Sequence, residues 1–77
     1  MSDRTNVYHD PISGMDYADL PNSELGLARF TNGNVYIGRL YEPGTRLHRV
    51  TNPDYEYAET IGAFRDLAQR FHEDSTQ

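Results

Sequence analysis

The sequence predicts an α+β domain in which a three-stranded antiparallel meander packs against one long C-terminal helix. Three observations lead to this prediction. An Asn-Gly pair lies between two alternating runs of apolar residues, a Pro-Gly turn follows the second run, and apolar residues then recur with helical spacing. A chain of 77 residues is long enough for one domain, and such a chain buries only about 60% of the surface that its unfolded form exposes.

The clearest local prediction is a β-hairpin around Asn32 and Gly33, because Asn-Gly is the preferred pair for a two-residue type I′ turn. A two-residue loop fixes the register and places Arg29 opposite Tyr36. The face toward the helix would then hold Phe30, Val35, Ala28 and Ile37. The opposite face would hold Arg29, Tyr36, Leu27, Leu25 and Leu40.

A second turn is predicted at residues 42–45, where the sequence reads EPGT. Proline fixes φ at the first central position of a turn, and glycine accepts a positive φ at the next. A third strand from Arg46 to Thr51 follows, with Leu47 opposite Leu40. The three strands then form a meander from Leu25 to Thr51.

The long helix is predicted from Pro53 to His72, with Asn52 as its N-cap and proline in its first position. Its apolar residues recur at steps of three and four, as an amphipathic helix requires. They are Tyr57, Ile61, Phe64, Leu67, Ala68 and Phe71. We expect this helix to cover the sheet face that holds Phe30, Val35, Ile37 and Val50.

The first 24 residues have a weaker pattern. The stretch SGMDYADL, residues 13–20, is a candidate short helix capped by Ser13 and stopped by Pro21. Residues 1–10 are predicted to be a flexible arm, residues 11–73 the folded domain and residues 74–77 a flexible tail. The N-terminal segment could cover the second sheet face through Met15, Tyr17 and Leu20, and this alternative stays open.

Charge is distributed unevenly around a net value of −5. Residues 1–24 have a net charge of −4, residues 25–50 of +3 and residues 51–77 of −4. Every basic residue among the seven Lys and Arg is arginine, and there is no cysteine. The lack of cysteine favours a reducing compartment, and no stretch is apolar enough to cross a membrane. We therefore expect a cytoplasmic protein, in a prokaryotic host cell if it is encoded by a phage.

Catalytic and metal-binding patterns are not found in the sequence. The histidines His9, His48 and His72 lack the i, i+4 pairing of zinc motifs, and no serine stands in a nucleophile motif. We expect no enzymatic activity, no metal and no cofactor.

The second sheet face is the candidate partner-binding site, because tyrosine and arginine are enriched where proteins bind each other. The candidate residues are Arg29, Tyr36, Leu40, Leu47 and Arg49. The favoured function is a small non-enzymatic interaction domain, such as an adaptor, a regulator or a phage-type inhibitor, that occupies the surface of another protein. A homodimer is a further option. The alternatives are nucleic-acid binding through the Arg/Tyr face, with Tyr and Arg side chains on bases and phosphates, and acidic mimicry of nucleic acid.

Overall fold

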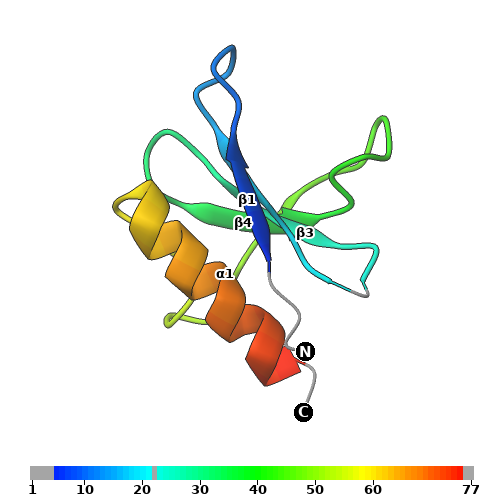
Figure 1. The fold of residues 1–77 in the computed structure, drawn as a ribbon. Helices are drawn as coiled ribbons and strands as arrows, with labels where there is room; N and C mark the ends of the chain where they lie inside the picture. Colours follow the sequence, from blue (N-terminus) through cyan, green and yellow to red (C-terminus); the bar gives the residue numbers. More distant parts are fainter. Residues whose placement is uncertain (1–4, 22, 76–77) are drawn as a thin grey trace.

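The computed structural model describes residues 5–21 and 23–75, which form a five-stranded antiparallel sheet with one helix on one of its faces (Figure 1). The strands are β1 (Asn6–His9), β2 (Asp16–Asp19), β3 (Gly26–Arg29), β4 (Val35–Gly38) and β5 (His48–Arg49), and they lie side by side in chain order. The helix is α1 (Ile61–Ser75). The α+β class and the meander are confirmed, and the prediction of three strands was two too few.

Strands β1 and β2 replace the predicted arm and short helix. In β2 burial alternates, so that Asp16 and Ala18 are buried while Tyr17 and Asp19 are half-buried. This period of two belongs to a strand and rules out the predicted helical face. β1 lies inside the stretch predicted as an arm, and helix α1 continues to Ser75, inside the predicted tail. Residues 1–4 of the arm and 76–77 of the tail lie outside the described residues.

The β3–β4 hairpin turns through three residues, not two. The Phe30 N–H donates to the Asn34 carbonyl at 2.9 Å, and the Gly33 N–H donates to the Phe30 carbonyl at 2.8 Å. Gly33 has a φ of 93°, as the third residue of such a loop requires. The register is therefore one residue away from the prediction, and a slip of one residue moves every side chain of β3 to the other face.

The consequence is that Arg29 lies opposite Val35, and Ala28 lies opposite Tyr36. The predicted faces were correct for β4 but wrong for β3. Leu27 and Arg29 point toward the helix, whereas Ala28 and Phe30 point away from it.

The predicted turn at residues 42–45 is present, because the Thr45 N–H donates to the Glu42 carbonyl at 3.1 Å and Gly44 has a φ of 79°. The strand after it is shorter than predicted. β5 has two residues and pairs Arg49 with Tyr36 and His48 with Ile37. This register is two residues away from the prediction, so Leu47 does not lie opposite Leu40, and a nine-residue connection runs from Arg39 to Leu47.

Helix α1 begins eight residues later than predicted. The residues before it are held by the sheet, since the Val35 N–H donates to the Glu56 carbonyl and the Ala58 N–H donates to the Gly33 carbonyl, both at 2.9 Å. Backbone groups used in this way cannot join a helix. The N-cap is Thr60, not Asn52, because the Thr60 Oγ1 accepts the Ala63 N–H at 3.1 Å. Within the described residues, no helix has the length and apolarity that a membrane span requires.

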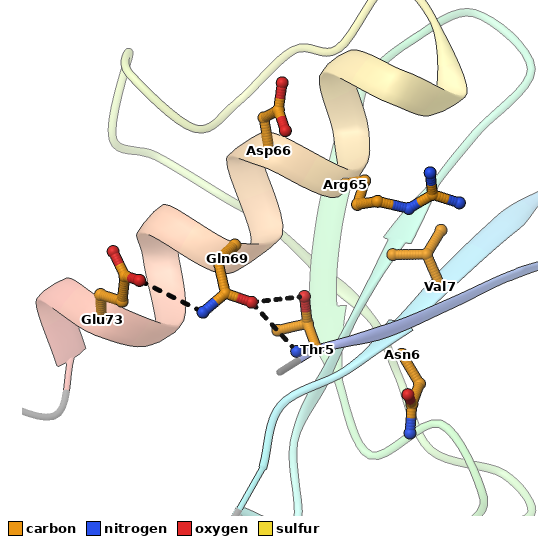
Figure 2. Close-up of a pocket in the computed structure, with 7 residues that line it drawn as sticks. All are labelled: Thr5, Asn6, Val7, Arg65, Asp66, Gln69 and Glu73. Atoms are coloured by element: carbon orange, nitrogen blue, oxygen red, sulfur yellow. Dashed lines mark hydrogen bonds between the residues drawn. The ribbon is translucent and has the colours of Figure 1, made fainter. Parts of the chain in front are cut away.

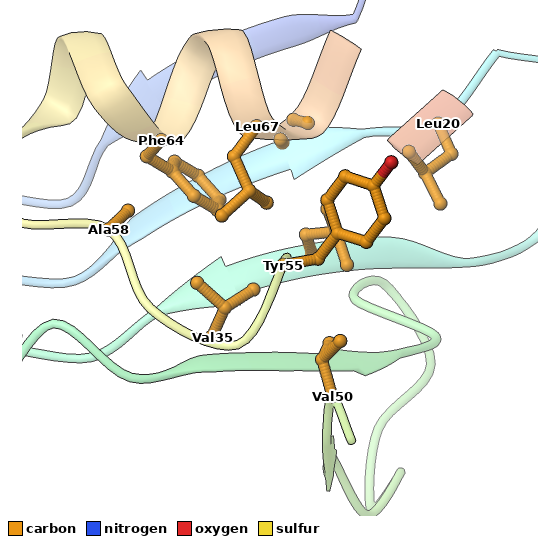
Figure 3. Packing of buried hydrophobic residues seen from close by; sticks show 10 residues of the cluster. Leu20, Val35, Val50, Tyr55, Ala58, Phe64 and Leu67 are labelled. Atoms are coloured by element: carbon orange, nitrogen blue, oxygen red, sulfur yellow. The ribbon is translucent and has the colours of Figure 1, made fainter. Parts of the chain in front are cut away.

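The hydrophobic core lies between α1 and the sheet (Figure 3). Phe64 and Leu67 of the helix share one buried cluster with Val35, and Ile37 packs against that cluster, so the predicted contact between helix and β4 is confirmed. The other buried members are Ala18, Leu20, Leu27, Val50, Tyr55, Ala58 and Ala68. One face of the sheet is thus covered by α1, and we call the opposite side the far face.

Candidate functional site

The far face carries a line of side chains that crosses all five strands. Each of its members is the Cα partner of the next, and directly paired residues of an antiparallel sheet point to the same side. The members are Tyr8, Tyr17, Ala28, Tyr36 and Arg49, which we call the cross-strand row. The row ends at Tyr8 on one edge of the sheet and at Arg49 on the other.

Aromatic rings associate in pairs along the row. The ring centroids of Tyr8 and Tyr17 are 5.6 Å apart with an angle of 28° between the ring planes, and those of Phe30 and Tyr36 are 4.3 Å apart. Ala28 lies between the two pairs and is completely buried. Ala28 therefore adds no accessible surface to the row, which is formed by the aromatic side chains on either side of it. Arg49 is exposed beside Tyr36.

The other half of the far face is covered by the connection between β4 and β5. A Cβ atom on Gly26 would lie 2.4 Å from the Leu40 Cδ1, and one on Gly38 would lie 2.6 Å from the Leu47 Cδ2. Only glycine leaves room for these two leucine side chains against the sheet. The predicted alternative, in which the N-terminal segment covers this face, was wrong, because that segment forms strands within the sheet.

Tyr41 fixes this connection to the sheet. Its hydroxyl lies 2.8 Å and 3.0 Å from the two carboxylate oxygens of Asp19 and 2.7 Å from the Tyr8 hydroxyl. The hydrogen bond with Tyr8, partial burial and the negative charge of Asp19 together raise the pKa of Tyr41 above its usual value. The phenol is therefore held in its neutral form.

Four of the five predicted site residues lie on the far face. Tyr36 and Arg49 belong to the cross-strand row, and Leu40 and Leu47 cover the two glycines beside it. The fifth, Arg29, lies on the helix side. Its Nε donates to the Ala58 carbonyl at 2.8 Å, its Nη2 donates to the Glu59 carbonyl at 2.7 Å, and its Nη1 binds Asp16. Arg29 thus ties the segment before α1 to the sheet.

Sequence reasoning missed Tyr8, Tyr17 and Phe30 as members of this surface. Phe30 was predicted on the opposite face because of the register error. Tyr8 was assigned to the flexible arm and Tyr17 to the short helix. The alternation in NVYH and DYAD, residues 6–9 and 16–19, was a signal that could have placed them, since each tyrosine stands between residues that face the helix side.

Titratable groups also meet on the helix side of the sheet. The buried Asp16 carboxylate binds Arg29 and lies 2.7 Å from the Nδ1 of His9. Across residues 5–21 and 23–75, no three His, Cys, Asp or Glu side chains are placed to hold a metal ion together. The Asp16 carboxylate is satisfied by its two partners and has a structural role.

Comparison of the chain with protein-family models, curated protein sequences and solved structures found no match. The site is therefore interpreted from its own geometry.

Proposed function

We propose that this domain is a non-enzymatic protein-binding module that engages its partner through the far face. The observation that carries the proposal is the cross-strand row, in which tyrosines from three strands lie in line with an exposed arginine. Tyrosine and arginine are the side chains that most often dominate the free energy of protein association. The row acts without a cofactor.

The distribution of arginines supports a protein partner over a nucleic acid. A nucleic-acid surface would need several arginines for phosphates. Arg29 lies on the other side of the sheet, and Arg39 is paired with Glu24 at 3.3 Å and Glu42 at 2.9 Å. Of the four arginines in residues 25–50, Arg46 and Arg49 then remain to meet phosphates, on a molecule with a net charge of −5.

The side chains along the row indicate which chemical groups a partner would present to it. The aromatic rings of the row and of Phe30 offer an apolar floor, which suits an apolar or aromatic side chain. Arg49 at the end of the row can donate two parallel hydrogen bonds to a carboxylate. The matching surface on the partner is an apolar group with an Asp or Glu beside it.

The test is capture of partners from lysate by the wild-type chain and by the double variant Tyr36→Ala/Arg49→Glu, with and without nuclease. We expect a partner that resists nuclease, is captured by the wild type and is lost in the variant. The matched control is Tyr57→Ala/Arg70→Glu, which changes the same residue types away from the far face and should retain the partner. Circular dichroism establishes that both variants are folded.

Two outcomes would contradict the proposal. Capture that disappears with nuclease would favour nucleic-acid binding by the same face. Equal capture by the wild type and the folded far-face variant would show that binding occurs elsewhere, as acidic mimicry by the helix and the flanks would require.

A further inference from the structure

Strand β1 is an edge of the sheet, and its free backbone groups can be assigned from the hydrogen-bond pattern. The Asp10 N–H donates to the Met15 carbonyl at 2.8 Å across the β1–β2 hairpin. Hydrogen-bonded and non-hydrogen-bonded pairs alternate along antiparallel strands, so Tyr8 and Asn6 turn their backbone groups toward β2. The N–H and C=O groups of Val7 and His9 therefore point outward.

A groove of about 650 Å³ runs beside this edge, between β1 and α1 (Figure 2). It is lined by Thr5, Asn6, Val7, Arg65, Asp66, Gln69 and Glu73. At one end of it the Thr5 N–H donates to the Gln69 Oε1 at 3.2 Å, which closes the edge there. The open part of the edge is thus the segment around Tyr8.

We propose that this edge pairs with the same edge of a second copy of the chain, antiparallel and with a two-fold axis at Tyr8. Val7 and His9 stand one residue on each side of Tyr8, so Val7 of each copy meets His9 of the other. Their outward groups then form hydrogen-bonded pairs, and the two β1 strands join two sheets into one. A self-complementary contact of this kind is what a two-fold interface requires.

Charge supports a second copy as the occupant. The chain has a net charge of −5, which opposes self-association over most of its surface. Strand β1, however, has no acidic side chain, so the paired strands themselves bring no carboxylates together. Arg65 and Asp66 line the same groove as Val7, and a two-fold axis reverses their order in the second copy. Each arginine can then approach the aspartate of the other chain.

The dimer also extends the far face. Tyr8 is the last member of the cross-strand row, and its ring is 38% exposed. Pairing at Tyr8 sets the two tyrosines against each other and joins two rows into one continuous surface. A partner protein would then meet a symmetric platform with an Arg49 at each end.

The first test is the mass of the full chain in solution over a range of concentrations, by analytical ultracentrifugation. We expect the mass to rise from the 8.8 kDa of one chain toward twice that value. His9→Pro removes an outward N–H that β2 does not use, and it should weaken dimerisation by about tenfold or more. His9→Ala is the matched control, because it removes the same side chain but keeps the N–H, and it should still dimerise.

A second test needs no proline. The chain has no cysteine, so Tyr8→Cys introduces a single thiol at the two-fold axis. Opposed residues of a non-hydrogen-bonded pair are close enough for a disulfide, and mild oxidation should give a covalent dimer. Ile12→Cys is the control, because Ile12 is 96% exposed at the hairpin tip but lies away from the axis. It should form a disulfide more slowly than Tyr8→Cys.

A third test reverses charge in the groove. Arg65→Asp and Asp66→Arg alone should each weaken the dimer, and the two together should restore it. The proposal is overturned if the chain stays monomeric at all concentrations, or if His9→Pro and His9→Ala dimerise equally. It is also overturned if Ile12→Cys forms a disulfide as fast as Tyr8→Cys. If the His9→Pro variant does not fold, the wild-type mass and the disulfide rates still decide the question.

Discussion

Asp16 and Arg29 are direct partners across strands β2 and β3, and their side chains form an ion pair on the helix side of the sheet. Asp16 is 2% exposed, and its other oxygen is 2.7 Å from the His9 ring. Arg29 also donates hydrogen bonds to the carbonyls of Ala58 and Glu59. One buried pair therefore joins two strands and fastens the segment that leads into α1.

We predict that Arg29→Met destabilises the domain by about 3 to 5 kcal/mol, because it leaves the buried Asp16 carboxylate without its cation. A domain of this size has a free energy of unfolding of roughly 5 kcal/mol, so the variant should be close to unfolded. Urea denaturation followed by circular dichroism measures the loss. The double variant Asp16→Asn/Arg29→Met removes the charge as well as its partner and should recover much of that stability. A double variant no more stable than Arg29→Met would show that the buried charge is not the cause.

A second prediction concerns the core under α1. Phe64 is completely buried, and Phe64→Ala should cost about 3 to 5 kcal/mol through lost burial and the cavity that remains. Ile61→Ala, on the same helix, is the control because Ile61 is 39% exposed, and it should cost roughly 1 kcal/mol or less. Thermal melting measures both. Similar melting temperatures for the two variants would contradict the packing of Phe64 against the sheet.

The middle of helix α1 could be predicted from the sequence, but its beginning could not. The spacing of Phe64, Leu67 and Phe71 reflects one buried helical face and identifies α1. The Asn52-Pro53 pair has the composition of a helix start, yet the Asn52 side chain accepts the Asp54 N–H within a turn. Pairing of residues 56–58 with residues 33–35 is a tertiary effect that local composition does not contain.

The register of the β3–β4 hairpin could not be predicted from the local sequence, for a similar reason. Asn32-Gly33 fits both a two-residue and a three-residue loop, and the two differ only in which face of β3 is buried. The ion pair of Arg29 with Asp16 belongs to the observed register, and it depends on a strand that was not expected. Once β2 is absent from the prediction, nothing in the hairpin alone distinguishes the two registers.

The candidate site was largely predicted because β4 and β5 were assigned to the correct faces. Tyr36 and Arg49 reach the far face in either register of β3, since their own pairing sets their side. Tyr8 and Tyr17 could not be assigned to the far face, because strands β1 and β2 were not predicted. Short strands of four residues with charged members give a weak alternating pattern, and Asp16 is buried only because Arg29 and His9 satisfy it.

A third prediction compares two glycines with positive φ. Gly33→Ala forces a non-glycine residue into the left-handed region, and the new Cβ would lie 2.5 Å from the Tyr57 Cε1. Gly44→Ala meets the same backbone cost, about 1 to 2 kcal/mol, with no atom within 4 Å of the Cβ. Gly33→Ala should therefore be the more destabilising variant in urea denaturation. Equal losses would contradict the packing of Tyr57 on the hairpin loop.

The last prediction follows from Tyr41, which holds the connection between β4 and β5 on the far face although 72% of its side chain is exposed. Its pKa in the folded protein is raised above the ordinary value of 10.0, chiefly by the hydrogen bond with Tyr8 and then by burial and by Asp19. A raised pKa means that the neutral phenol favours the folded state. This contribution to stability is fully present below pH 10 and is lost as the pH rises through the folded pKa.

We therefore expect the absorbance titration of the tyrosines to contain a late phase at high pH that Tyr41→Phe removes. Asp19→Asn should bring that phase to lower pH, because the carboxylate no longer opposes the phenolate charge. Ionisation of Tyr41 should also release residues 39–47, so their amide hydrogen exchange should become less protected in wild type at high pH. In Tyr41→Phe the same amides should be less protected already at neutral pH. Identical titration curves for the wild type and Tyr41→Phe would mean that the Tyr41 phenol is not held by Tyr8 and Asp19 in solution.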